Sequence, residues 1–271
     1  MIISISRRCD IPRFKFDWFM ERLNEGFVDA VNPYNPRQIK RVSLVKDDVE
    51  AFVFWTRDPK HILANVKELE DRGYPFYVMV TVTGYPNALE PNQASVLEVL
   101  ESMKELSQKI GKERVIWRYD PIILTDITDD EFHCRNFKKL SQDLSGYVKR
   151  VIISIYDEYK KAAKRLNELE SEGKLKLLDM EFDNLYGNLL DFKESASAAD
   201  MEIQSCAEKE DFSSIGIKPG ACIDAALIEK ICGKEIKGKD KYQRPNCLCC
   251  KSTDIGAYKT CEANCAYCYA S

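Results

Sequence analysis

The stretch AFVFWTRDPKHILANVKELEDRGYPFYVMVTV, residues 51–82, contains a complete strand–helix–strand unit. Residues 51–55 and 76–82 are short apolar runs rich in β-branched and aromatic side chains, as buried strands are. Between them, residues 59–72 have helical spacing, and Pro59 stands where a first helical residue is favoured. Strands joined by a helical crossover lie parallel, so this unit predicts an α/β fold.

The same alternation extends on both sides of this unit. No Gly-x-Gly-x-x-Gly follows a predicted strand, so a dinucleotide-binding fold has little support. Six or seven units favour a full or partial (β/α) TIM-like barrel over a doubly wound sheet. The further predicted strands are 2–6, near 27–31, 114–118, 151–155 and 202–205, and the further helices are 16–25, 91–110, 129–144 (Thr128 and Glu131 having capping-box spacing), 156–172 and 182–197.

The residue pattern of the sequence changes after Cys206. A short helix at 224–231 is followed by a Gly- and Lys-rich stretch and then by a group of cysteines. We therefore predict a barrel core over residues 1–206. Residues 207–271 are predicted to form a cysteine-rich, metal-binding extension that packs on the barrel mouth.

Composition limits the possible functions. The chain has 271 residues, of which 45% are hydrophobic and 31% charged, with a net charge of -4. This composition is typical of a globular protein, and its charge balance does not demand a nucleic-acid partner. No signal-peptide pattern or membrane-length apolar run is evident, so the chain is expected to be cytoplasmic with no membrane partner. Disulfides are rare in the cytoplasm, so eleven cysteines favour metal binding or catalysis.

Six of these cysteines lie in the last 25 residues. Cys261, Cys265 and Cys268 form the pattern C-x3-C-x2-C. Three thiolates at this spacing can hold three irons of a four-iron four-sulfur (4Fe-4S) cluster and leave the fourth iron open to a small molecule. The pattern therefore predicts a site for chemistry.

Two other interpretations of the tail compete with the cluster. Cys247-x2-Cys250 and Cys265-x2-Cys268 are separated by fourteen residues, which is close to the spacing of a structural zinc ribbon. Alternatively, all six are reduced thiols, although such a group would be prone to oxidation.

A second metal centre is also predicted. Cys206, Cys222, Cys247 and Cys249 together would supply four thiolates to an auxiliary iron–sulfur cluster or to zinc, if folding brings them together. Cys9, Cys134 and Cys232 are expected to be ordinary thiols. Of these three, Cys9 has the best chance of a functional role, because it lies at a strand end.

Charged residues follow several predicted strands, where barrels place their chemistry. Arginines at such positions can clamp carboxylates, phosphates or ribose hydroxyls. Arg118 and Asp120 alternatively pair with each other. The predicted catalytic contacts are Arg118, Asp120 and Arg7, and the predicted cofactor contacts are Arg57, Tyr267 and Arg8.

The tail resembles the cluster loop of radical S-adenosylmethionine enzymes, and its AYCYA flank (266–270) is most similar to the spore photoproduct lyase branch. Stretches over nearly the whole chain resemble a bacterial and archaeal domain-of-unknown-function family with a cysteine-rich C-terminus. They are SRRCDIP (6–12), NPYNP (32–36), FVFWTRDP (52–59), VTGYPNALEP (82–91), VIWRYDPI (115–122), CIDAALI (222–228) and the cysteine cluster (247–270).

The resemblance implies that S-adenosylmethionine binds the open iron and is cleaved to a 5'-deoxyadenosyl radical. Radical enzymes carry the three-cysteine loop after their first strand, whereas here it ends the chain. A circular permutation reconciles the two if residues 254–258 supply a strand beside 2–6. The glycine-rich S-adenosylmethionine signature is not evident.

The resulting hypothesis is a radical S-adenosylmethionine enzyme with an electron donor and an unknown substrate, either a small molecule or nucleic acid. The alternative is a zinc-stabilised barrel that binds nucleic acid or a partner through residues 234–244. A third possibility is a hydrolase that uses Asp120 and Asp10 as acid and base.

Overall fold

The protein is described by a computed structural model that covers residues 1–32, 35–179, 182–241 and 243–270. One sheet contains β1 (Ile2–Ile5), β4 (Ala51–Thr56), β5 (Phe76–Thr81), β6 (Val115–Ile122), β7 (Arg150–Ile155), β8 (Glu202–Cys206), β9 (Lys218–Gly220) and β10 (Thr253–Asp254). Its order is β10-β1-β4-β5-β6-β7-β8-β9, and all neighbouring pairs are parallel.

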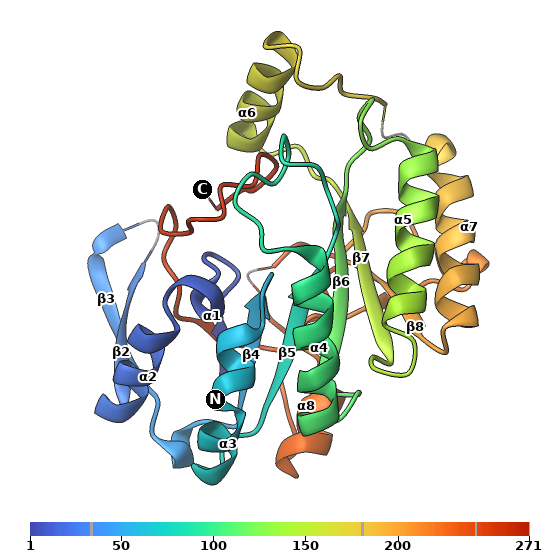
Figure 1. Cartoon of the computed structure of the whole chain (residues 1–271). Coiled ribbons are helices and arrows are strands. Elements are labelled where there is room, and N and C mark those ends of the chain that lie inside the picture. Colours follow the sequence, from blue (N-terminus) through green and yellow to red (C-terminus); the bar gives the residue numbers. More distant parts are fainter. Residues whose placement is uncertain (33–34, 180–181, 242, 271) are drawn as a thin grey trace.

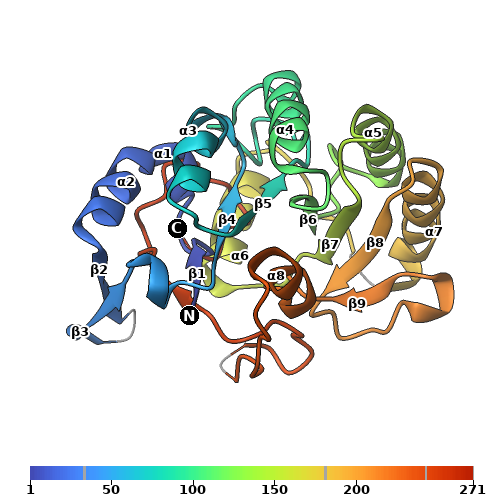
Figure 2. The ribbon, with the colours of Figure 1, turned by 90° about the horizontal axis from the view of Figure 1, so that it is seen from below.

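The two faces of this sheet are covered differently. The helices are α1 (Ile11–Phe14), α2 (Phe16–Glu25), α3 (Lys60–Asp71), α4 (Val96–Ile110), α5 (Asp130–Asp143), α6 (Lys160–Ser171), α7 (Phe182–Ala198) and α8 (Ala225–Cys232). Figure 2 shows α3, α4, α5 and α7 along the outer side of the curved sheet and α8 on the other side. The sheet therefore has an outer face under helices and an inner face under α8 and the C-terminal segments.

Alternation along the strands builds a core on each face. Phe52 and Phe54 of β4 pack in the large outer core, while Val53 and Trp55 pack on the inner face with Leu227 of α8. Successive strand residues point to opposite faces, so a continuous apolar run such as AFVFWT suits a strand buried on both sides. Residues 51–82 fold as predicted, with β4, α3 and β5 in order.

The predicted α/β class and parallel sheet are confirmed, but closure into a barrel is not shown. Within the part of the chain that the structure describes, β10 and β9 are the two edge strands of the order. The strand predicted near 27–31 is β2 (Phe27–Asn32), which pairs antiparallel with β3 (Asn35–Ser43) in a separate two-stranded sheet. Taking it for a barrel strand was wrong, because its partner is an adjacent strand rich in charge. Residues 33 and 34 of NPYNP lie outside the described residues.

Two helix starts differ from the prediction by several residues. α4 begins at Val96 and not at 91, and α6 begins at Lys160 and not at 156, since each helix is preceded by several residues that lead away from the strand end. The N-cap of α5 is Asp129, whose carboxylate accepts from the Phe132 N–H at 2.9 Å. The Thr128 hydroxyl donates to the Ile123 carbonyl instead, at 2.9 Å.

The C-terminal segment returns to the start of the chain. β10 lies parallel to β1, with Ile3 opposite Thr253 and Ser4 opposite Asp254. A strand beside residues 2–6 was predicted at 254–258, and it occurs at Thr253–Asp254. In Figure 1 the final residues then run across the carboxyl ends of the strands, towards α6. In the described ranges no helix is long and apolar enough to cross a membrane.

Candidate functional site

Asp254 of β10 fixes the start of the tail. Its carboxylate accepts hydrogen bonds from the hydroxyls of Ser4 (2.9 Å) and Ser6 (2.6 Å) and from the backbone N–H groups of Arg7 (2.8 Å) and Gly256 (2.9 Å). These donors belong to β1, to the turn after it and to the turn after β10. The carboxylate therefore ties the beginning of the cysteine loop to the carboxyl end of β1.

Each cysteine of the tail loop has a different partner. The thiol of Cys261 is hydrogen-bonded to that of Cys9, and this bond lowers the pKa of Cys261 to about 6. Gln93 Nε2 donates to Cys265 Sγ at 3.2 Å. Cys268 Sγ accepts from the backbone N–H two residues on, at 3.3 Å. Cys9, expected to be an ordinary thiol, thus lies beside the loop.

A buried ionic network holds the loop on the carboxyl ends of the strands. Arg57, after β4, donates to the Tyr267 hydroxyl at 2.9 Å and to Thr83 Oγ1 at 2.7 Å, and it pairs with Glu90. Tyr267 also donates to Glu90, and Thr83 donates to Glu90 at 2.6 Å. The Arg57 and Glu90 side chains are 13% and 4% exposed. Arg57 and Tyr267, both predicted cofactor contacts, are therefore joined to each other, and cofactor binding by them stays a prediction.

Arg165 of α6 holds the other side of the loop. Its Nε donates to the Ala266 carbonyl at 3.0 Å, and its Nη2 donates to the Cys268 carbonyl. Carbonyl groups in a loop of this kind have no strand partner, so a guanidinium with several donors satisfies two of them at once.

The predicted catalytic arginines lie together. The guanidinium groups of Arg7 and Arg118 both stand over the ring of Trp55, at 5.7 Å and 4.7 Å from its centroid. Arg118 pairs with Asp120, as the alternative interpretation held, and Ser154 also donates to Asp120. The predicted cofactor contact Arg8 lies apart from them, with its guanidinium over Tyr258 at 5.3 Å and within 3.4 Å of the Gly256 carbonyl. The structure thus brings Arg7, from the turn after β1, and Arg118 of β6 to one place at the inner face of the sheet.

The second cysteine set is also brought together. Cys206 Sγ and Cys222 Sγ are 3.2 Å apart, and the thiol of Cys249 is hydrogen-bonded to those of Cys222 and Cys247. Cys222, Cys247 and Cys249 are buried against the inner face of the sheet. Four thiols from the end of β8, the turn before α8 and the approach to β10 therefore form one chain of contacts.

The described residues contain no group of three or more His, Cys, Asp or Glu side chains arranged about a point as a metal ion requires. The predicted zinc-ribbon pairing is not formed either. Cys247 and Cys250 pack in the inner-face cluster, whereas Cys265 and Cys268 pack with Tyr85 in another. The two knuckles are close in sequence, but β10 lies between them and sends the second one to the carboxyl ends of the strands.

A cavity of about 500 Å³ opens beside the second cysteine set. It is lined by residues that follow β7 and β8, among them Tyr156 and Glu208, and by Arg244. Glu208 accepts from the Ile155 N–H at 3.0 Å, and burial raises its pKa to about 7. Arg244 donates to the Cys206 carbonyl at 3.2 Å. This cavity has the location expected of a substrate site in an α/β sheet.

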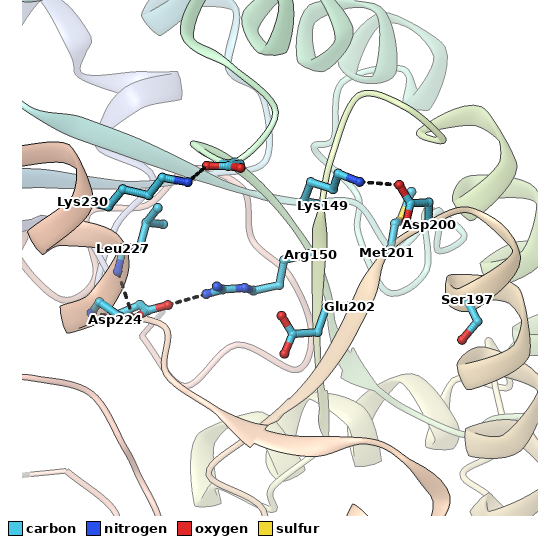
Figure 3. Close-up of a pocket in the computed structure, with 11 residues that line it drawn as sticks. Lys149, Arg150, Ser197, Asp200, Met201, Glu202, Asp224, Leu227 and Lys230 are labelled. Atoms are coloured by element: carbon cyan, nitrogen blue, oxygen red, sulfur yellow. Dashed lines mark hydrogen bonds and ion pairs between the residues drawn. The ribbon is translucent and has the colours of Figure 1, made fainter.

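A larger cavity, of about 690 Å³, lies at the opposite, amino ends of the strands. Figure 3 shows that its charged side chains point at each other. Lys149 pairs with Asp200, and Arg150 pairs with Asp224 at 2.5 Å. Lys230 on α8 pairs with a carboxylate that precedes β6. These ion pairs connect neighbouring elements, so the charges serve the structure at this end.

The remaining predicted candidates have local structural roles. Asp10 caps α1 by accepting from the Arg13 N–H at 3.1 Å, and it accepts from the Arg57 N–H at 2.8 Å. Both carboxylates of the hydrolase hypothesis, Asp10 and Asp120, are thus engaged with other groups. In the basic segment 234–244, Lys237 pairs with Glu235 and Arg244 pairs with Asp157.

Four residues that position the loop were missed from the sequence: Glu90, Gln93, Arg165 and Asp254. Glu90 stands before a proline in the sequence, and Asp254 begins the strand predicted at 254–258. Glu90 meets Arg57 and Tyr267 only in three dimensions, so no local pattern marks it. The same holds for Asp254, whose partners Ser4 and Ser6 lie at the other end of the sequence.

Comparison with known proteins gives one family. The model of the family described as "Domain of unknown function (DUF1848)" matches residues 2–270. Neither the curated proteins nor the solved structures include a match to this chain.

Proposed function

We propose the following function for this chain, which belongs to the DUF1848 family. The proposal is based on the position of its three-cysteine loop. Cys261, Cys265 and Cys268 hold a 4Fe-4S cluster, and the protein is a radical S-adenosylmethionine enzyme. The supporting observation is that β10 lies parallel to β1 and leads into the three-cysteine loop. The loop then follows an edge strand of a parallel sheet, which is the arrangement expected if a radical enzyme's first strand were moved to the end of the chain.

The thiols of the loop do not surround one point in the described structure, but their donor chemistry suits such a cluster. Three thiols lie within eight residues of chain, and each is near the apolar cluster around Tyr85. N–H donors already meet two of the sulfurs, from Gln93 and from the backbone after Cys268. Hydrogen bonds to sulfur and partial burial are two properties by which proteins tune iron–sulfur clusters. Bound there, a cluster with one open iron supplies the electron for reductive cleavage of S-adenosylmethionine.

The chain's own residues position and shield the loop. Asp254 fixes its start, Tyr267 is locked to Arg57 and Glu90, and Arg165 holds its last carbonyls. Because the loop lies at the carboxyl ends of the strands, it shares that end with the cavity beside Glu208. We take this cavity as the substrate site, with Arg244 and Glu208 as its charged contacts.

The proposal is tested by iron and sulfide analysis of protein reconstituted without oxygen. The native chain should bind about four irons and four sulfides. Cys265→Ala should lose most of both, whereas Cys134→Ala, which removes a thiol bonded to Asp191 between α5 and α7, should keep them. A colourless native protein under these conditions, or full iron retention by Cys265→Ala, would contradict the proposal.

A further inference from the structure

We propose that Cys206, Cys222, Cys247 and Cys249 form a second metal site, a structural zinc centre with four thiolate ligands. The site is independent of the tail loop and lies on the inner face of the sheet, against α8. Its ligands come from three separate segments, namely the end of β8, the turn before α8 and the Cys-Leu-Cys sequence before β10.

The spacing of the thiols favours a single ion over an iron–sulfur cube. A tetrahedral zinc with bonds of about 2.3 Å places its sulfurs roughly 3.8 Å apart. Cys206 Sγ and Cys222 Sγ are 3.2 Å apart, and Cys249 is within hydrogen-bonding reach of Cys222 and Cys247. The four thiols form a chain of contacts and do not surround one point, so zinc binding requires small shifts of their side chains. A cube would hold the four sulfurs much farther apart, so it requires larger movements of these buried groups.

The surroundings suit the charge of such a centre. Four thiolates on one zinc ion carry a net charge of about -2, which is costly to bury without nearby cations. The guanidinium groups of Arg7 and Arg118 lie over Trp55, whose side chain packs in the same cluster as the thiols. Among the described groups, the buried Nε of Arg118 has no hydrogen-bond partner. A backbone N–H, that of Ile223, already donates to Cys249 Sγ at 3.3 Å.

Such a centre would join the C-terminal segment to the sheet. Residues between β8 and β10 contain only short regular elements, namely η2 (Ser213–Ile215), β9 and α8. One ion bound to both Cys206 and Cys249 would hold the two ends of this segment together and position β10 beside β1. Metal sites of this type replace apolar burial where a segment has few packing contacts of its own.

Metal analysis of variants tests the inference separately from the proposed function. The variant Cys261→Ala/Cys265→Ala/Cys268→Ala lacks the tail ligands and should still contain about one zinc per chain. Adding Cys222→Ser/Cys249→Ser should abolish zinc binding, whereas adding Cys250→Ser, a buried neighbour outside the set, should not. Retention of zinc by the five-fold variant, absence of zinc from the tail variant, or iron in its place would overturn the inference.

A second measurement remains informative if the five-fold variant does not fold. The tail variant, freed of zinc and titrated with Co²⁺ alone, should develop the visible bands of tetrahedral cobalt and thiolate charge-transfer absorption. Alkylation followed by peptide mass analysis should then show all four cysteines protected only when metal is bound. A cobalt spectrum without thiolate bands, or a Cys206–Cys222 disulfide formed in the metal-loaded protein, would overturn the inference.

Discussion

Ser4 Oγ donates a hydrogen bond to Asp254 Oδ2 at 2.9 Å, and this contact joins the first strand of the chain to its last. The two residues are also direct partners in the register of β1 and β10. The cysteine loop therefore has a defined origin in the sheet although it lies at the end of the sequence. Its position depends on contacts between residues some 250 apart.

Replacing Asp254 should destabilise the protein and release the loop. Asp254→Ala leaves the Arg7 and Gly256 N–H groups and two hydroxyls without their acceptor. Buried donors left unpaired cost about 1–3 kcal/mol each, so we expect a loss of about 3 kcal/mol in the free energy of unfolding. Urea titration measures this change. Asp71→Ala, at an exposed residue that pairs with Lys67, should change it by less than about 0.5 kcal/mol.

The network around Arg57 should show an order of effects. Glu90→Ala leaves a buried guanidinium without its counter-charge and should cost about 3–5 kcal/mol. Tyr267→Phe removes one hydroxyl and leaves the ion pair, so it should cost about 1 kcal/mol. Chemical denaturation of both variants tests the order. Equal costs would show that the ion pair adds nothing beyond the tyrosine contact.

His133 should make stability depend on pH. Its Nε2–H donates to the Ile123 carbonyl at 3.1 Å, so Nδ1 accepts from the Tyr119 hydroxyl at 2.8 Å, and the ring is neutral. Burial lowers the pKa of His133 from 6.5 to about 4. Between these values the unfolded chain binds a proton that the folded chain does not, so the fold loses stability as the pH falls from 6.5 towards 4.

The loss assigned to His133 is about 3 kcal/mol over that range. It is measured as the difference between the native chain and His133→Gln in unfolding titrations at several pH values. The control is His61→Gln, because His61 is the other histidine of the chain and is exposed. A difference that does not change with pH would show that the pKa of His133 is the same in the folded and the unfolded chain.

Under the proposed function, Arg165 should determine how firmly the loop keeps the cluster. Arg165→Ala removes the donors to the Ala266 and Cys268 carbonyls, so the loop should open more often. We expect iron loss to a chelator to be faster by about tenfold, which corresponds to about 1.4 kcal/mol. Arg135→Ala, an exposed substitution on α5, should leave the rate unchanged. Equal rates for both variants would contradict a clamping role.

Much of the fold was predictable from local patterns. Apolar runs of six residues with helices between them specify β4, α3 and β5, and α2 occurs at the predicted residues 16–25. β3 was missed because three of its nine residues are charged and most are exposed, so no apolar run marks it. β9, with the sequence Lys-Pro-Gly, has three residues of low strand propensity and depends on its neighbour β8.

The sequence marks the candidate ligands of the proposed site but not the residues that support them. Cysteine spacing marks Cys261, Cys265 and Cys268, and the strand-end rule marks Arg57 and Arg118. The partners of these residues are not marked, because Glu90, Arg165 and Asp254 are ordinary charged residues until the fold brings them to the loop. Pairing across long sequence separations is set by packing, which single-sequence patterns do not contain.

The central claim concerns an iron cluster with one open corner on the tail loop. Electron paramagnetic resonance of the reduced, reconstituted protein, recorded before and after adding S-adenosylmethionine, tests it most directly. The account predicts a 4Fe-4S signal that changes when S-adenosylmethionine is added, accompanied by formation of 5'-deoxyadenosine, with both lost in Cys265→Ala. A signal that S-adenosylmethionine leaves unchanged, with no 5'-deoxyadenosine formed, would contradict it.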